Sequence, residues 1–150
     1  MSMFARELIK LKYYALDKKS CLNEMVELLY EKGIVKFPER FFKSIIDREK
    51  LMSTGIGRKV AIPHARSDAV DELKIAVYLL DNELEFDSID GEPVQIIFMI
   101  AVPERMKEVY MKVLSAISNF FRKEENRDRI LHCTSVDELC TILEEVNDEI

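Results

Sequence analysis

Residues 55–66 read Gly-Ile-Gly-Arg-Lys-Val-Ala-Ile-Pro-His-Ala-Arg. Within this stretch, residues 60–62 are small, partly β-branched and bounded by turn residues, which predicts a short buried strand. Pro63 cannot donate a hydrogen bond to a sheet, so we expect the strand to end there and to present His64 at its carboxyl end. Ligands of open α/β sheets bind at the carboxyl ends of strands. His64, one of only two histidines in the chain, is therefore the first candidate for a functional residue.

The residues around His64 favour a negatively charged ligand. The two glycines of the stretch permit a tight loop whose backbone amides turn toward an anion. Arg66 adds a positive charge, and Arg58 and Lys59 would do the same if the fold brings them near. A histidine beside such an anion cradle suggests phosphate chemistry.

Together with an upstream acid, the stretch resembles the signature of a known family. Glu49 is followed, after six residues, by Ile-Gly-Arg-Lys-Val-Ala-Ile-Pro-His-Ala at 56–65. This is similar to the phosphorylation-site signature of the IIA domains of the bacterial phosphoenolpyruvate-dependent sugar phosphotransferase system, of the fructose, mannitol and nitrogen-regulatory type. The resemblance runs from about Leu22 to Leu143 and includes the Asp-Gly-Glu-Pro-Val turn at 90–94.

The resemblance implies both an activity and a set of site residues. His64 would accept a phosphoryl group from phosphohistidine on the carrier protein HPr and pass it to a IIB domain, so that the chain would be a phosphotransferase component. Arg48 would lie beside the active histidine, and the Thr54 hydroxyl would be available to the phosphate. The further candidates for supporting the phosphoryl group are Tyr110, Arg66 and Gly55.

The residues taken alone leave simpler interpretations open for two of these candidates. Arg48 is also interpreted as a solvated cation at a helix end, where the helix dipole favours positive charge. Thr54 fits a plain turn or cap equally well.

An imidazole with a reference pKa of about 6.5 is largely neutral at about pH 7, so His64 has a lone pair that can attack phosphorus. Transfer of this kind rests on positioning and charge stabilisation, and we expect neither a metal nor a cofactor.

One position departs from the family pattern. Members of the family usually carry a second histidine near the first, in a His-Leu-x-x-Leu-Ser pattern. When residues 114–115 are aligned with the final Leu-Ser of that pattern, Tyr110 falls at the position of the histidine. Tyr110 then has three interpretations: it joins the apolar stripe of its helix, its hydroxyl replaces one hydrogen bond of the missing imidazole, or transfer is degraded and the protein is regulatory. His132 does not align with the missing histidine, and we interpret it as a satisfied or surface residue at a helix end.

Composition predicts a single globular domain over residues 1–150, with an apolar fraction of 48%. The net charge of -6, from 22 basic and 28 acidic residues, argues against a nucleic-acid-binding protein. No apolar run reaches about 18 residues and the first residues lack a signal-peptide core, so we expect no membrane insertion and a cytoplasmic location.

Hydrophobic periodicity predicts an α/β fold. Residues 1–19 fit either a strand or a short helix. The segments 75–80 and 94–102 are apolar on both faces, which predicts strands covered on both sides. Helices are expected from Ser20 to Gly33, from Pro38 to about residue 49, from Pro103 to Phe121, over 124–133 and after a capping box at 135–138. Residues 67–73 are expected to form a loop, and the acidic residues of 81–90 a solvated connection without a metal site.

These patterns combine into one fold and two further functional alternatives. We expect a three-layer sandwich in which a mixed sheet of about five strands carries helices on both faces. Besides a relay, the chain would serve as a binding module that reports the phosphorylation state of His64 to a transporter, kinase or transcription regulator. It would otherwise be a scaffold that has kept the fold without the transfer.

Overall fold

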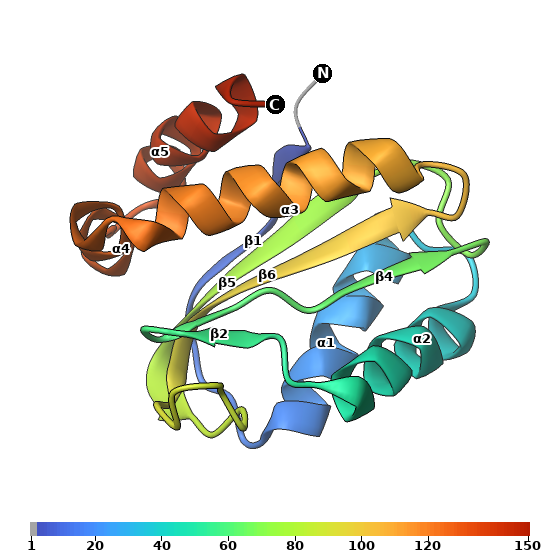
Figure 1. Cartoon of the computed structure of the whole chain (residues 1–150), viewed down its shortest axis with the longest axis horizontal. Helices are drawn as coiled ribbons and strands as arrows, with labels where there is room; N and C mark the ends of the chain where they lie inside the picture. The colour runs from blue at the N-terminus through green and yellow to red at the C-terminus, as the bar shows by residue number, and fades with distance from the viewer. Residues whose placement is uncertain (1–2) are drawn as a thin grey trace.

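The computed structural model describes residues 3–150, which form a mixed β-sheet between two layers of helices (Figure 1). The strands are β1 (Phe4–Tyr13), β2 (Gly55–Gly57), β3 (Val60–Ala61), β4 (His64–Ser67), β5 (Lys74–Leu84) and β6 (Val94–Pro103). The helices are α1 (Lys18–Glu31), α2 (Pro38–Leu51), α3 (Lys107–Arg122), α4 (Glu124–Leu131) and α5 (Val136–Asp148). The predicted three-layer α/β sandwich is confirmed.

The sheet has the order β1-β5-β6-β3-β2, with β4 also paired to β6. β1 runs parallel to β5, β5 antiparallel to β6, and both β3 and β4 parallel to β6. Ala61 pairs with Ile97 and His64 with Ile100, an advance of three residues on each strand. β3 and β4 are therefore one strand in constant register, broken in the middle. The sheet has six strands where about five were expected.

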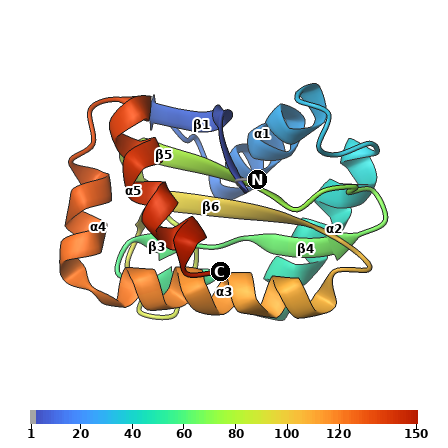
Figure 2. The ribbon, with the colours of Figure 1, turned by 90° about the horizontal axis from the view of Figure 1, so that it is seen from above.

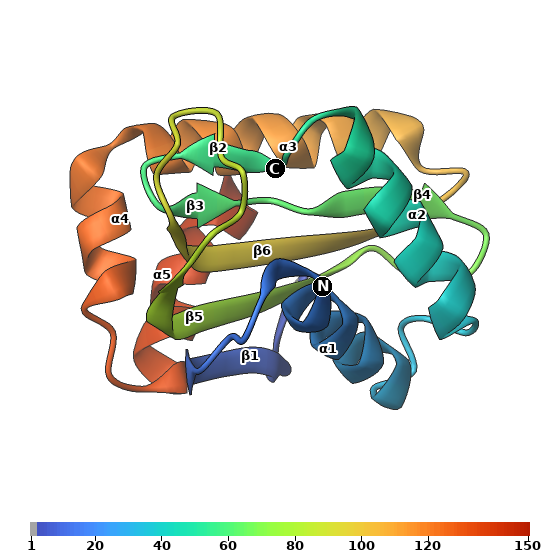
Figure 3. The same ribbon diagram turned by 90° about the horizontal axis from the view of Figure 1, so that it is seen from below.

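Side chains alternate between two hydrophobic cores, one on each face of the sheet. On β5, Ala76 and Tyr78 join the core under α1 and α2, whereas Ile75 and Val77 join the core under α3, α4 and α5. Figure 2 shows the face covered by α3 and α5, and Figure 3 shows the face covered by α1 and α2. The double coverage explains why residues 75–80 of β5 are all apolar and why β6 is apolar at nearly every position.

The helix ends follow local sequence signals. Asp17 caps α1 by accepting a hydrogen bond from the Ser20 amide at 2.8 Å, so the helix begins slightly before the expected Ser20. Pro38 occupies the first position of α2, as predicted. Ser135 caps α5 by accepting from the Glu138 amide at 3.1 Å, which confirms the expected start of that helix. None of the helices within 3–150 is both long enough and apolar enough to cross a bilayer.

The structure corrects two expectations about prolines. β3 ends at Ala61, just before Pro63, but His64 does not stand at a free strand end: the Pro63 carbonyl accepts a hydrogen bond from the Ile100 amide at 2.9 Å, and pairing with β6 resumes at His64. Residues 64–67 therefore form β4. Pro103 does not open the long helix: it ends β6, and α3 begins at Lys107 after a turn in which the Met106 amide bonds the Pro103 carbonyl at 3.0 Å.

Two further segments differ from or extend the sequence expectations. Residues 4–13 form a strand, which decides between the strand and the helix that the sequence left open. Residues 55–57 are also a strand, paired with β3 in a hairpin, and not a loop around an anion. Its turn is made by Arg58 and Lys59, whose φ values of 56° and 71° give the left-handed turn that suits a two-residue hairpin.

Candidate functional site

His64 lies on β4 between α2 and α3, where the sheet ends (Figure 1). Its side chain is only 6% exposed. It borders a cleft of about 410 Å³. The cleft is lined by Ser44, Asp47, Arg48, Leu51, His64, Ala65, Arg66 and Tyr110. The cleft therefore receives side chains from three elements, and its one imidazole sits largely out of water.

The backbone fixes the tautomer of His64. Its Nδ1 lies 2.6 Å from the carbonyl oxygen of Ile62. Because a carbonyl can only accept, Nδ1 carries the hydrogen, and in the neutral ring the lone pair is on Nε2. Burial lowers the pKa of His64 below its ordinary 6.5, the positive charge of Arg48 lowers it further, and the hydrogen bond to Ile62 opposes both. At neutral pH the site thus holds an uncharged imidazole with Nε2 available.

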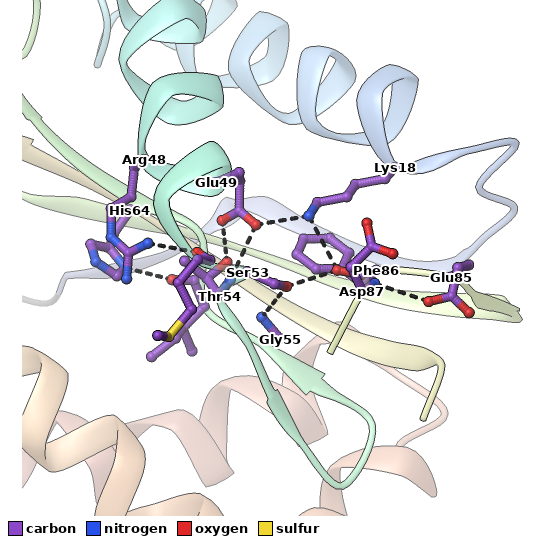
Figure 4. A network of polar contacts seen from close by, with 12 residues as sticks. Lys18, Arg48, Glu49, Ser53, Thr54, Gly55, His64, Glu85, Phe86 and Asp87 are labelled. Atoms are coloured by element: carbon purple, nitrogen blue, oxygen red, sulfur yellow. Dashed lines mark hydrogen bonds and ion pairs between the residues drawn. The ribbon is translucent and has the colours of Figure 1, made fainter. Parts of the chain in front are cut away.

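Arg48 comes from the last turn of α2 and points toward His64 (Figure 4). Its Nη1 donates to the carbonyl of Met52 at 2.7 Å. This bond closes the end of the helix and holds the guanidinium at the edge of the cleft. Arg48 thus combines the helix-end position that the sequence suggested with a place beside the histidine.

Arg66 and Tyr110 bring a second cation and a hydroxyl to the same cleft. Arg66 follows His64 on β4, and its Nη1 donates to the Glu104 carbonyl at 3.1 Å. The ring of Tyr110 on α3 lies 5.5 Å from the ring of His64, centroid to centroid, at an angle of 52°. Burial raises the pKa of the Tyr110 hydroxyl, while the charges of Arg48 and Arg66 act in the opposite direction. Tyr110 therefore presents a protonated hydroxyl near two cations.

Thr54 is next to the site but does not line the cleft. Its side chain is buried, and its hydroxyl donates to the Glu49 carboxylate, which also accepts from the Thr54 amide at 3.1 Å. Gly55 also lies behind the cleft: its amide donates to the Ser53 hydroxyl at 3.0 Å. A Cβ at Gly55 would lie 2.3 Å from the Ser88 Oγ, so this position needs a glycine for close packing. Both residues hold the loop that carries the site.

The structure separates the remaining basic candidates from His64. Arg58 and Lys59 form the turn between β2 and β3, where Arg58 donates to the carbonyl of Arg122 at the end of α3. His132 follows α4 as its C-cap, is exposed, and places Nδ1 2.7 Å from the Asp128 carbonyl. The interpretation of His132 as a helix-end residue is confirmed. Within residues 3–150, no group of three or more potential metal ligands is found.

Several residues of the site were not identified from the sequence. Glu49 was noted only as part of a signature, yet it holds Thr54 and contacts Lys18 of α1 at 3.0 Å. Asp47 also borders the cleft, where Lys43 binds its carboxylate at 2.7 Å. The signal available in the sequence was that Asp47 and Glu49 flank Arg48 on the last turns of the same predicted helix.

These features define a class: a domain that presents a neutral, backbone-anchored histidine in a cationic cleft at a sheet edge. Residues 2–146 match the family model described as "Phosphoenolpyruvate-dependent sugar phosphotransferase system, EIIA 2", and the chain belongs to that family. The resemblance noted in the sequence is thereby confirmed.

Relatives of two kinds are similar to this chain. The fructose-specific EIIA component of Haloferax volcanii is 30% identical over 140 residues, which are 93% of this chain and 91% of the relative. A nitrogen regulatory protein of Pseudomonas aeruginosa is 32% identical over 130 residues, 87% of this chain and 84% of the relative. The fructose-specific EIIABC component of Bacillus subtilis is 31% identical over 141 residues, 94% of this chain but only 22% of that longer protein.

Solved structures give the same two kinds of neighbour. The nitrogen regulatory protein IIA-Ntr of Neisseria meningitidis superposes with a TM-score of 0.88 at 32% identity, covering 94% of this chain and 96% of that one. The mannitol IIA enzyme of Escherichia coli, solved in complex with phosphorylated IIB, gives a TM-score of 0.82 at 25% identity, covering 95% and 99%.

Proposed function

We propose that this chain is a phosphohistidine relay of the phosphotransferase system, which takes a phosphoryl group from phospho-HPr on His64 and passes it to a IIB domain. The observation that carries the proposal is the state of His64. The imidazole is buried and uncharged, its Nδ1–H is held by the Ile62 carbonyl, and Nε2 is left as the nucleophile.

The transfer follows from that geometry. The Nε2 lone pair of His64 forms a bond to phosphorus while the bond from phosphorus to the donor nitrogen breaks, and the electron pair of that bond returns to the donor imidazole. Positive charge develops on the ring of His64 as its lone pair is donated. The Ile62 carbonyl, 2.6 Å from Nδ1, stabilises this charge. Passing the group to a IIB domain reverses these changes on His64.

The side chains of the cleft would supply charge stabilisation for this transfer. Arg48 and Arg66 would face the phosphoryl oxygens, and the Tyr110 hydroxyl would donate to one of them. Thr54 and Gly55 would contribute by holding the loop behind His64, because their polar groups already bond Glu49 and Ser53. Their part in the transfer would therefore be indirect.

The complex of mannitol IIA with phosphorylated IIB supports a IIB domain as the acceptor. HPr is proposed as the donor because it is the carrier that the family resemblance implies. The proposed compartment is the cytoplasm, as the sequence led us to expect.

A regulatory role is the second candidate, because a nitrogen regulatory protein is 32% identical to this chain and IIA-Ntr superposes with a TM-score of 0.88. In that role His64 would be phosphorylated in the same way, but the phosphorylated and free forms would differ in affinity for a regulatory partner. The substitution of Tyr110 for the family's usual second histidine is compatible with either role.

The test is phosphorus NMR of the protein incubated with phosphoenolpyruvate, Enzyme I and HPr. With HPr in catalytic amount, we expect a stoichiometric phosphoimidazole signal in the wild type and in His132→Ala, which removes the exposed histidine, and only the small signal of phospho-HPr in His64→Ala. A stoichiometric signal that survives in His64→Ala, or a folded wild type that stays unmodified, would contradict the proposal. Addition of a IIB domain then separates the two roles, because a relay loses its signal to the acceptor and a regulator keeps it.

A further inference from the structure

We propose that Lys18 and Glu49 are positioning residues for His64, which act through Thr54 and Ile62 to decide which ring nitrogen is left free for the phosphoryl group. Neither residue lines the cleft. The inference rests on the proposed function for its kinetic consequence, but its structural part concerns the unphosphorylated protein alone.

Glu49 is the centre of the arrangement. Its side chain is 5% exposed, and its carboxylate contacts three groups: the Lys18 ammonium at 3.0 Å, the Thr54 amide at 3.1 Å and the Thr54 hydroxyl. A buried carboxylate with these partners holds Thr54 at two points, backbone and side chain. The loop after α2 is thereby tied to a helix that lies far from it in sequence.

From Thr54 the contacts continue to the histidine. The Thr54 carbonyl accepts a hydrogen bond from the Ile62 amide at 3.0 Å. The carbonyl of the same Ile62 accepts from His64 Nδ1 at 2.6 Å. An unbroken series of polar contacts therefore runs from Lys18 through Glu49, Thr54 and Ile62 to the imidazole; Figure 4 shows the Lys18, Glu49 and Thr54 part and His64 beside it.

Lys18 is itself fixed, so it can serve as an anchor. Its ammonium donates to the Phe86 carbonyl at 3.1 Å and lies 4.3 Å from the centroid of the Phe86 ring. The same carbonyl accepts from the Ser53 hydroxyl at 2.7 Å. Lys18 thus compensates the buried charge of Glu49. It also joins α1 to the end of α2 and to the segment that carries Phe86.

Two functional groups depend on this one loop. Met52, two residues before Thr54, accepts the hydrogen bond that orients Arg48, and Thr54 sets the strand segment that orients His64. When Glu49 no longer holds Thr54, we expect the Ile62 carbonyl to lose its fixed position. The imidazole is then free to exchange its Nδ1–H form for the Nε2–H form, which has no lone pair on Nε2.

The experiment compares the folded variants Lys18→Met, Glu49→Gln and Lys18→Arg. Glutamine keeps one acceptor for Thr54 but not the charge, and arginine restores the cation. The matched control is Lys10→Met, which removes the other lysine–glutamate pair made with α1, Lys10 to Glu24 at 2.7 Å, away from the cleft. The first readout is nitrogen NMR of the His64 ring, taken with no phosphoryl donor present.

We expect the wild type, Lys18→Arg and Lys10→Met to show the Nδ1–H form, and Lys18→Met and Glu49→Gln to show a mixture of both forms. The second readout is phosphoryl acceptance from HPr, in which misplacement of the ring should reduce kcat by about 10- to 100-fold. The KM for phospho-HPr should stay within about twofold of the wild type, because neither residue lines the cleft and the expected change is in the ring of His64.

A folded Lys18→Met protein with the wild-type tautomer and the wild-type kcat would overturn the inference. If Lys18→Met does not fold, the double variant Lys18→Met/Glu49→Gln removes the buried charge altogether, and a wild-type tautomer there would overturn it equally. Absence of phosphorylation in every protein, wild type included, would refute the proposed function. The NMR of the free ring would then still decide whether Lys18 and Glu49 position it.

Discussion

Replacing Tyr110 by phenylalanine tests the role of the hydroxyl that stands where the family resemblance led us to expect a second histidine. The substitution removes one hydroxyl and keeps the ring, which lies 5.5 Å from the ring of His64. Burial raises the pKa of the Tyr110 hydroxyl, so the group keeps its proton at neutral pH and can act only as a donor to a phosphoryl oxygen.

The size of the effect follows from the charge of the acceptor. A hydrogen bond to a charged group contributes about 1.5–3 kcal/mol. Since about 1.4 kcal/mol corresponds to a tenfold change in rate, Tyr110→Phe should slow phosphoryl acceptance by roughly 10- to 150-fold if the bond forms only in the transition state. The fold should be little affected, because the ring stays in the apolar stripe of α3.

The assay is the single-turnover rate of His64 phosphorylation by phospho-HPr, with Tyr30→Phe as the control because Tyr30 is 48% exposed on α1. Equal rates for Tyr110→Phe and the wild type would refute the reasoning and leave Tyr110 as a packing residue. Tyr110→His extends the test. A large gain in rate would identify a degraded relay, and no gain would identify Tyr110 as a working substitute.

Three further predictions concern pH and stability. Burial and then the Arg48 charge lower the pKa of His64, and only the neutral ring attacks, so phosphoryl acceptance should persist as the pH falls through 6.5 and decline only at lower pH. Arg48→Met should raise the pH of this decline, and an NMR titration of the His64 ring should show the same upward change in its pKa. A wild-type decline centred above pH 6.5 would contradict the prediction. Gly55→Ala should destabilise the protein by about 1–3 kcal/mol in urea unfolding, because the new Cβ meets Ser88 Oγ at 2.3 Å, and Ser88→Ala should recover part of the loss. Failure of that second substitution to help would mean that the contact is not the cause. Ser135→Ala should cost about 0.5–2 kcal/mol through loss of the α5 cap, with Ser135→Asp close to the wild type in the same measurement.

The sequence predicted the elements whose signals are local. Pro38 and Ser135 mark helix starts because the hydrogen bonds involved lie within one turn of the chain. The strand predicted at 94–102, observed as β6 at 94–103, was identified because a run that is apolar on both faces needs cover on both sides. The prolines at 63 and 103 were interpreted less well, because a missing amide hydrogen does not say what the carbonyl binds. The Pro63 carbonyl pairs with β6, whereas the Pro103 carbonyl closes a turn before α3.

The residues of the candidate site also fall into those that the sequence identified and those whose contacts only the structure shows. His64 was identified through the motif at 55–66 and Arg48 through the family resemblance, as the residue before Glu49, and the structure places both at one cleft. The orientation of Thr54 and Gly55 was not accessible, because their partners are decided by side chains of other segments: Glu49 takes the Thr54 hydroxyl, and Ser88 lies against Gly55.

The sequence by itself thus determined most of the helices, the long buried strands and the candidate histidine, because periodicity, caps and short motifs act over a few residues. Only the tertiary structure decided the tautomer of His64, the nearness of Tyr110 and the link from Lys18 through Glu49 to the ring. The physical reason is that these contacts join α1, α2, α3 and the broken strand. Their distances exist only once the sheet and both helical layers have packed.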